Sequence, residues 1–425
     1  MVSEQKMRKF ILDSAGSGKT KRALDITAED RLVIVICPAS VIDTWLKQTP
    51  QWSDRTAYAY RGTMRGRMLE SALTAERGLL AMSYEMTRDF RLSSLPRGFT
   101  LIVDESHYVK NTRSQRSQLV RMFSDRAERV LLMTGTPTRK DLEDLYGQCN
   151  ILYPKRNDRV EHFGEPFASL TAFRKAYGTP SVLWVNGVAR TKWSYADSMA
   201  SRVASIIAGD VLPVRLSDME SPDEEWIMAP KTDRELQALA QWDRERELTD
   251  DVYAASASAA AGKLAQLDDG FAYDVDGNPY RFGDSKMRAV IDYAKRNNIE
   301  RLLVWCRYKA SAEAFLTRAD AMLATEFLQS PRDDVRFIVG NFQSMGTGVD
   351  GLQKLMSQQC FIDLPYTSAD YEQAIARLVR RGQEDTPGLY VVDTLVNRRI
   401  MDVIKGRKRL DEITREPLTV ADKES

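Results

Sequence analysis

The 425-residue sequence lacks any apolar run long enough to span a bilayer, and its polar N-terminal stretch lacks the apolar segment of a signal peptide. Its four cysteines are far apart, which favours buried small apolar side chains over disulfides or a zinc site. The net charge of +1 indicates no general affinity for a polyanion, so a nucleic-acid surface would need a local group of Lys and Arg. We therefore expect a cytoplasmic protein of two or three domains that does not contact a membrane.

Short apolar runs separated by helical patterns recur in both halves of the chain. Near-continuous apolar strands that alternate with helices predict parallel sheets covered on both faces, with ligands at the carboxyl ends of the strands. The sequence thus predicts an α/β fold with two sheets in tandem. The expected strands are residues 10–12, 32–37, 78–82, 101–103 and 130–133 in the first sheet, and 302–305, 337–339, 360–362 and 389–392 in the second.

Residues 13–20 follow the first of these strands and precede a helical pattern. A glycine turn between a strand and a helix N-terminus directs backbone N–H groups and the helix dipole at one point, which makes an anion site. In such a phosphate loop Lys19 would reach the β- and γ-phosphates of a nucleotide, and the Thr20 hydroxyl would bind Mg²⁺. The strict pattern has glycine where this sequence has Asp13, so the loop alone could be a chance match.

The polar residues that follow the other strands are the next candidates. Ser, Thr, Asp and Pro at such positions are ordinary in turns and helix caps. That interpretation is weaker for Asp104 and Glu105, because two carboxylates directly after a buried strand carry a desolvation cost unless a cation such as Mg²⁺ faces them.

Together these segments resemble the motif series of superfamily-2 helicases, and within them the Swi/Snf-type double-strand DNA translocases, particularly short forms from bacteriophages and bacteria. The extension of motif II by Lys110 and Asn111 is the most branch-specific match in the first half. The matching segments are 10–20 (motif I), 37–40 with Trp45 (Ia), 104–107 with its extension to 114 (II), 134–137 (III), 307–309 (IV), 343–353 (V) and 371–383 (VI).

The resemblance implies two RecA-like domains that close on Mg²⁺-ATP. Its catalytic residues here would be Lys19, Asp104, Glu105, Arg377 and Arg380, with Thr20 and Asp104 holding the metal. Other nucleotide-binding residues would be Ser14, Gly16, Ser17, Gly18, Gln373, Gly348 and Asp350, and His107, Thr134, Gly135 and Thr136 would couple nucleotide state to DNA. The expected DNA contacts are Ser40, Ser83, Lys110, Asn111, Arg113, Arg307 and Lys309.

Arg377 and Arg380 are three residues apart, a spacing that places both on one face of a helix. By itself such a pair indicates two basic side chains on a solvent-exposed helix face. The resemblance to motif VI instead implies arginine fingers that neutralise charge on the γ-phosphate.

The resemblance also implies domain limits. We expect a first RecA-like domain over residues 1–155, a helical insertion and interdomain connection over 156–216, a second RecA-like domain over 217–410 with an inserted segment at about 231–284, and a C-terminal tail over 411–425. The insertion mixes aromatic and basic residues, among them Trp184, Trp193 and Tyr195. Such a mixture can form a base-stacking surface, but helical packing is the expectation because no glycine-rich single-strand motif accompanies it.

Two features of the family are missing. The arginine pair of its interdomain brace is not found, and the segment before the phosphate loop does not show the adenine-reading glutamine motif, so only the resemblance indicates ATP.

Our first hypothesis is a DNA-dependent ATPase that tracks along double-stranded DNA and either remodels branched DNA in repair or recombination or displaces bound proteins. We expect it to be monomeric and to act in the cytoplasm, or in the host cytoplasm if a phage encodes it. One alternative is a strand-separating DNA or RNA helicase, against which the absence of an obvious separation-pin insertion argues. Another is an ATP-gated DNA clamp with little turnover, against which Glu105 and the two arginines argue.

Overall fold

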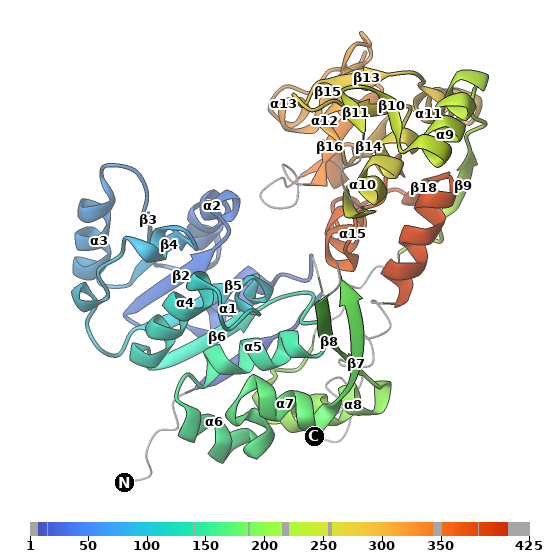
Figure 1. Cartoon of the computed structure of the whole chain (residues 1–425). Helices are drawn as coiled ribbons and strands as arrows, with labels where there is room; N and C mark the ends of the chain where they lie inside the picture. Colours follow the sequence, from blue (N-terminus) through green and yellow to red (C-terminus); the bar gives the residue numbers. More distant parts are fainter. Residues whose placement is uncertain are drawn as a thin grey trace. The chain divides into compact units, whose positions relative to one another are not determined.

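The computed structural model describes residues 7–14, 16–138, 141–185, 188–214, 221–253, 257–342, 351–380 and 382–406. These residues divide into two compact units, the first made of residues 7–214 and Gly406 and the second of residues 221–405. Each unit is built on a six-stranded sheet in which all neighbouring strands are parallel (Figure 1). The α/β fold with two tandem sheets is therefore confirmed.

The first sheet has the strand order β1-β6-β5-β2-β4-β3. Its strands are β1 (Arg8–Ile11), β2 (Leu32–Cys37), β3 (Thr56–Ala59), β4 (Gly78–Ser83), β5 (Thr100–Asp104) and β6 (Arg129–Met133). Five of the six were expected from their apolar runs. The edge strand β3 was missed because its four residues are partly exposed and do not form such a run.

Helices cover both faces of this sheet, as a parallel sheet requires. Along β2, Ile34 and Ile36 pack into one apolar core, and Val33 and Val35 into another on the opposite face. Helices α1 (Lys19–Ile26) and α2 (Ile42–Trp52) supply the second of these cores. The other helices of this unit are α3 (Arg65–Thr74), α4 (Gln115–Arg126), α5 (Glu143–Leu152), α6 (Arg156–Phe163), α7 (Leu170–Tyr177) and α8 (Asp197–Ile207), and each of them contributes to the first core.

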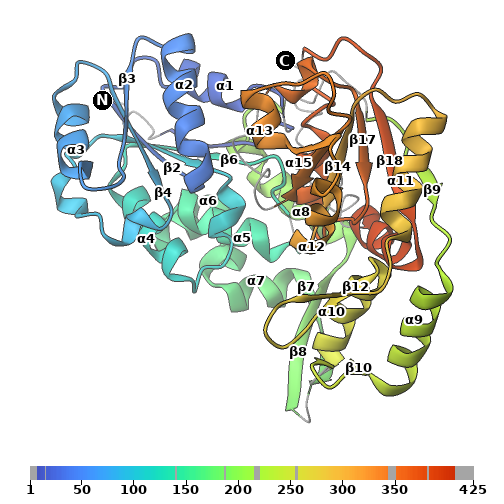
Figure 2. The same ribbon diagram turned by 90° about the horizontal axis from the view of Figure 1, so that it is seen from above.

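The expected helical insertion is helical only in part. Between α7 and α8 the chain forms an antiparallel ribbon of β7 (Gly178–Val185) and β8 (Val188–Tyr195), whose two strands run side by side in Figure 2. Trp184, Trp193 and Tyr195 lie on these strands, and Trp184 is largely exposed, so the expectation of packing between helices is wrong for Trp184. It is confirmed for Tyr195, which packs against the helical core of this unit. The other aromatic residues of the insertion, Phe163, Phe167, Phe173 and Tyr177, are buried in that core. Val182, Trp184 and Val185 before the turn and Val188 after it favour strands, and in the sequence Asn186-Gly187 stands between them, a strong hairpin signal that was overlooked.

The second sheet has the order β15-β16-β14-β17-β18-β9. Its strands are β9 (Glu225–Met228), β14 (Leu302–Cys306), β15 (Ala321–Leu323), β16 (Phe337–Asn341), β17 (Gln358–Phe361) and β18 (Gly388–Asp393). The four expected strands are confirmed. The edge strands β9 and β15 were missed, since both are short and only partly buried.

Helices again pack on both faces. Helices α11 (Ser285–Arg296) and α12 (Lys309–Leu316) pack on one face, and α13 (Ala324–Gln329) and α15 (Ser368–Ile375) on the other. A segment before α11 has a small core of its own around Trp242. It consists of α9 (Asp233–Glu245), β10 (Glu247–Thr249), β11 (Val252–Tyr253), α10 (Ala257–Asp268), β12 (Phe271–Tyr273) and β13 (Pro279–Arg281).

Among the described residues, no helix has the length and apolar character needed to cross a bilayer.

Candidate nucleotide site in the first unit

The loop between β1 and α1 has the backbone of an anion-binding turn. Gly16 and Gly18 have φ of 76° and 89°, in the left-handed region that side-chain-bearing residues avoid. Gly18 is the N-cap of α1, so Lys19 and Thr20 begin the helix where its N–H groups and positive dipole end point outward. The Lys19 ammonium donates to the carbonyl oxygens of Asp13 and Ser14, at 3.0 and 2.9 Å, and therefore lies over the loop.

Asp13, which stands where the strict pattern has glycine, has a structural partner. Its Oδ1 accepts a hydrogen bond of 2.6 Å from Nη1 of Arg22, and both side chains are buried. The same Arg22 nitrogen donates to the carbonyl oxygen of Pro213 at 2.8 Å, and Leu212 N–H donates to Phe10 O of β1 at 2.9 Å. The Asp13–Arg22 pair thus helps to hold the residues near 212 against β1, the strand that leads into the loop. Sequence spacing gave no signal for this pair, because only the packing of α1 against β1 brings the two residues together.

Asp104 ends β5, on the same carboxyl edge of the sheet as the loop, and is nearly buried. Its Oδ2 accepts from the indole N–H of Trp45 at 3.0 Å, and its Oδ1 accepts from the backbone N–H of Glu105 at 3.0 Å. Burial and then the Glu105 carboxylate raise the pKa of the Asp104 carboxyl, which Trp45 and Lys19 oppose, and the outcome is a rise from 3.8 to about 6. The sequence did not indicate that Trp45 holds this carboxylate.

Glu105 has a left-handed backbone, with φ of 52°, which is uncommon for a residue with a side chain and typical of functional sites. Its Oε2 lies 3.3 Å from Nδ1 of His107, and the same ring nitrogen lies 3.0 Å from Oγ1 of Thr134. Thr134 Oγ1 in turn accepts from the backbone N–H of Thr136 at 3.1 Å. One chain of polar contacts therefore joins the residues after β5 to those after β6, including three of the four expected coupling residues.

Helix α5 connects to the same residues from the other side. Gln148 accepts from the Ser106 hydroxyl at 2.7 Å and donates to the carbonyl oxygen of Pro137 at 2.8 Å. The ammonium of Lys110 lies 2.9 Å from Oδ2 of the nearly buried Asp144. Lys110, an expected DNA contact, is thus held in an ion pair within the unit. The contributions of Gln148 and Asp144 were not anticipated, because both lie well beyond the motifs in the sequence.

The residues of this edge fit a Mg²⁺-nucleotide. The loop offers backbone N–H groups and an ammonium for phosphate oxygens, and Asp104 and the Thr20 hydroxyl are oxygen ligands of the kind that Mg²⁺ prefers. A buried carboxyl whose pKa is raised by desolvation is the group that a bound cation would stabilise. The structure therefore places Lys19, Thr20, Asp104, Glu105 and His107 along one edge of the first sheet.

Four expected DNA contacts lie near the carboxyl ends of strands in this unit but differ in exposure. Ser40, Asn111 and Arg113 are exposed, and Asn111 Oδ1 accepts from the backbone N–H of Arg113 at 3.1 Å. Ser83 is nearly buried at the end of β4, and its hydroxyl accepts from Met86 N–H at 3.3 Å. Ser83 therefore has less free surface for a phosphate than the other three.

In the second unit, Arg307 follows β14 and Lys309 begins α12. The Arg307 guanidinium donates to the carbonyl oxygen of Leu364 and lies 4.0 Å from the ring centroid of Tyr366. The Lys309 side chain is 85 % exposed and lies 3.4 Å from Glu313. Of these two expected contacts, only Lys309 extends into solvent.

The expectation that Arg377 and Arg380 share a helix face is wrong. Helix α15 ends at Ile375, and the bonds of the following turn include Arg377 N–H to Ala374 O at 3.1 Å and Arg380 N–H to Leu378 O at 3.1 Å. Neither arginine therefore lies on a helix, and helix geometry does not relate their side chains. The half-buried Gln373 is on α15. Gly348 and Asp350 lie outside the described residues.

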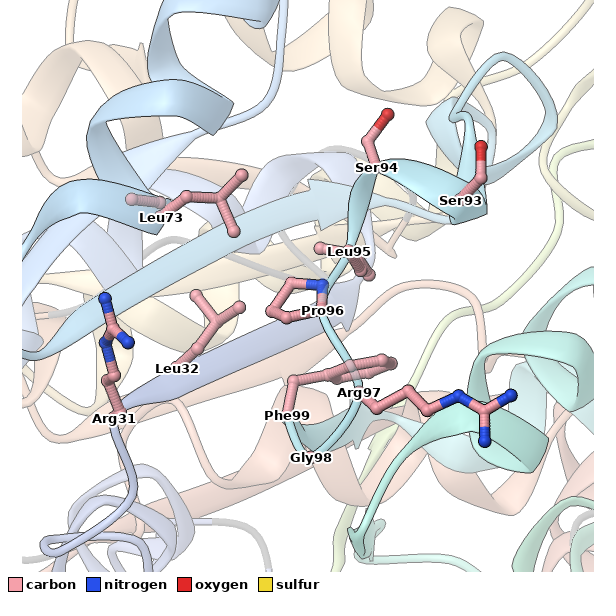
Figure 3. Close-up of a pocket in the computed structure, with 11 residues that line it drawn as sticks. Arg31, Leu32, Leu73, Ser93, Ser94, Leu95, Pro96, Arg97, Gly98 and Phe99 are labelled. Atoms are coloured by element: carbon pink, nitrogen blue, oxygen red, sulfur yellow. The ribbon is translucent and has the colours of Figure 1, made fainter.

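A separate pocket of about 520 Å³ lies by the amino ends of β2 and β5, where Leu32 and Phe99 stand. Figure 3 shows apolar side chains around the hollow, with Arg31 and Arg97 on either side of it. Because Lys19 and Asp104 lie at the carboxyl ends of their strands, this pocket is not part of the nucleotide site.

The fold and this edge define the first unit as a phosphate-loop α/β domain. Residues 6–204 match the family model described as the SNF2-related domain. Those residues are therefore similar to SNF2-related domains, in agreement with the motif series read from the sequence.

Relatives match over a similar number of residues. The yeast (Saccharomyces cerevisiae) protein "ISWI chromatin-remodeling complex ATPase ISW2" is 30 % identical over 178 residues, which are 39 % of this chain and 16 % of that protein. The mouse (Mus musculus) protein "DNA annealing helicase and endonuclease ZRANB3" is 28 % identical over 185 residues, 37 % of this chain and 17 % of that protein. The chain thus spans less than a fifth of the length of either relative.

A solved structure, "Sulfolobus solfataricus SWI2/SNF2 ATPase core in complex with dsDNA", is similar with a TM-score of 0.39 and 14 % identity, over 99 % of this chain and 91 % of that one.

Proposed function

We propose that this chain hydrolyses Mg²⁺-ATP and uses the reaction to move along double-stranded DNA, remodelling branched DNA in repair or recombination or displacing bound protein. The observation that carries the proposal is the meeting of a phosphate loop and the Asp104-Glu105 pair on one edge of the first sheet. The relatives support it, since one is named an ATPase of a chromatin-remodelling complex and another a DNA annealing helicase.

In this proposal Lys19 and the loop N–H groups bind the phosphates, and Thr20 and Asp104 hold Mg²⁺, which stabilises negative charge on the phosphate oxygens. Glu105 accepts the proton of the attacking water. Its distance of 3.3 Å from His107 gives the carboxylate a partner that links it to Thr134. The family resemblance assigns Arg377 and Arg380 the neutralisation of charge on the transferred phosphoryl group, an effect worth a factor of about a thousand or more.

The exposed candidates Ser40, Asn111, Arg113 and Lys309 would contact phosphates. Such contacts position a protein on DNA without reading its sequence, which a motor requires because it must hold every register about equally well.

A phosphate-release assay with duplex, forked and single-stranded DNA and with RNA tests the proposal. We expect duplex DNA to stimulate hydrolysis, and we expect Lys19→Ala or Glu105→Gln to abolish it while the fold survives. Lys21→Ala is the matched control, because Lys21 is on the same helix with a side chain that is 49 % exposed and paired with Asp25. Wild-type rates in either site variant would refute the assignment.

The same assay separates the two alternative functions. Stimulation by single-stranded DNA or RNA alone would favour a strand-separating helicase, and nucleotide-dependent DNA binding without phosphate release would favour a clamp. The monomeric state and cytoplasmic location remain predictions, which sedimentation and cell fractionation would test.

A further inference from the structure

The ribbon of β7 and β8 is the least buried apolar element of the first unit. Its strands pair from Gly178 with Tyr195 to Val185 with Val188, and no third strand joins them in the described part of the chain. Trp184 is 73 % exposed and Val182 64 % exposed. An indole so exposed contributes little to folding, and a group of exposed large apolar side chains on one element is typical of a binding surface.

The two faces of the ribbon differ chemically. Directly paired residues share a face, so Trp184 and Val182 lie on one side with Trp193, and Arg190 and Lys192 lie on the other. Residues 178–195 contain these two cations and no Asp or Glu. The face with Arg190 and Lys192 also carries Leu183 and Val188, which are 46 % and 57 % exposed. Two indoles on one face and two cations on the other suit a polyanion that also offers stacking surfaces, as a nucleic acid with unpaired bases does.

The base of the ribbon is fixed to the body of the unit. The Tyr195 hydroxyl donates to Oε1 of Glu143 at 2.7 Å, and the Arg174 guanidinium donates to both oxygens of the same carboxylate, at 2.9 and 2.8 Å. Gly178 allows close packing there, because a Cβ atom at this position would lie 2.9 Å from the Trp193 ring and 3.0 Å from Arg174 O. The ribbon therefore extends from a rigid base, as Figure 2 shows beside α7.

That base is joined to the nucleotide site through the first turns of α5. Glu143 holds Tyr195, the next residue Asp144 pairs with Lys110 at 2.9 Å, and Gln148 bonds Ser106 at 2.7 Å. One helix therefore contacts both the residues after Asp104 and the base of the ribbon.

We propose that the β7–β8 ribbon contacts DNA at the boundary between paired and unpaired strands, with the Trp184 indole stacked on the first unpaired base and Arg190 and Lys192 facing the phosphates of the other strand. The proposal rests on the proposed DNA-dependent ATPase function and adds to it a preferred substrate, forked or branched DNA. A blunt duplex keeps its bases stacked inside and offers the indole no partner.

The test measures binding of the full-length protein to a forked duplex, to a blunt duplex of the same sequence and to vesicles of anionic phospholipid. We expect Trp184→Ala to weaken fork binding about tenfold or more, the usual effect of losing one stacked base, and to leave blunt-duplex binding and duplex-stimulated ATPase activity unchanged. Trp184→Phe should retain most of the affinity. Trp52→Ala, which removes a 48 % exposed indole from α2, is the matched control.

Arg190→Gln with Lys192→Gln should lower the slope of log affinity against log salt for the fork by about one to two. A 2-aminopurine at the fork boundary should change its fluorescence on binding wild type and the double charge variant, but not Trp184→Ala.

Equal fork binding by wild type and Trp184→Ala, with duplex-stimulated hydrolysis intact, would overturn the ribbon proposal alone. Vesicle binding that depends on Trp184 in the absence of a fork effect would likewise overturn it in favour of a lipid surface. Failure of wild type to bind any DNA or to hydrolyse ATP would instead overturn the proposed function together with the ribbon.

Discussion

Lys286 provides the most severe test of the packing in the second unit. It is the second residue of α11, and its side chain is only 3 % exposed. Its ammonium lies 2.7 Å from Asp268, 2.6 Å from Asp269 and 3.2 Å from Asp363. Asp268 and Asp269 lie at the end of α10 and Asp363 follows β17, so one lysine connects the inserted segment to the sheet.

The variant Lys286→Met keeps the aliphatic volume and removes the charge, leaving three nearly buried carboxyls without this cation. Removing one partner of a buried ion pair typically costs about 3–5 kcal/mol. Since a domain is stable by about 5–15 kcal/mol, we expect the second unit to lose about a fifth or more of its free energy of unfolding. Lys231, 3.3 Å from Asp268, compensates only that carboxylate.

The loss should depend on pH in a defined direction. Lys286 lowers the pKa of Asp268 and of Asp363, whereas burial and Asp363 raise the pKa of Asp269 well above its usual value. A lowered carboxyl pKa adds stability above the unfolded value of about 4 and loses it as pH falls through the folded value. In Lys286→Met the carboxyls lose this cation while burial still raises their pKa, so they take up protons as the pH falls from 8 toward 4. The cost of the substitution should therefore be largest near pH 8 and should shrink toward pH 4.

Hydrogen exchange read by mass spectrometry gives the opening free energy of each unit separately. Peptides covering β14 and β17 should lose protection in Lys286→Met at pH 8, and less so at pH 5 after correction for intrinsic exchange rates. Lys295→Met is the control, because Lys295 is exposed on the same helix. Adding Asp269→Asn should restore part of the loss. Unchanged protection at pH 8, or an equal loss at both pH values, would refute the reasoning.

Two further predictions concern the first unit. Asp104→Asn should raise the free energy of unfolding of the ligand-free protein at pH 8 by about 2 kcal/mol. The rise in the Asp104 pKa from 3.8 to about 6 corresponds to a penalty of about 3 kcal/mol, which the substitution removes. The substitution also loses one hydrogen bond, which costs about 1 kcal/mol. A raised carboxyl pKa destabilises the folded state only at pH values above that pKa, so urea titrations should show the gain in stability disappearing near pH 4. A gain in stability that persists at pH 4 would contradict the desolvation argument. Gly178→Ala should destabilise by about 1–3 kcal/mol, since the added Cβ would lie 2.9 Å from Trp193 and 3.0 Å from Arg174 O, and a thermal melt indistinguishable from wild type would show that the ribbon base is loosely packed.

The sequence by itself determined the features that depend on neighbouring residues. Apolar runs such as residues 32–37 must be buried on both faces, so nine strands and two parallel sheets could be read from them. The turn at Gly16 and Gly18 followed from the same logic, because glycine reaches a left-handed backbone and the helix after it supplies the N–H groups. Even the overlooked ribbon carries its signal locally, in the strand-favouring residues on either side of Asn186-Gly187.

Only the tertiary structure decided which distant residues meet. Arg22 beside Asp13, Trp45 beside Asp104 and the three carboxyls around Lys286 are brought together by helices packing on sheets. The end of α15 before Arg377, which a spacing of three residues did not reveal, was decided in the same way. Charge and polarity in the sequence indicate that such residues need partners when they are buried. Any opposite charge that the fold brings close can serve, so the partner of each residue is decided only when the chain has folded.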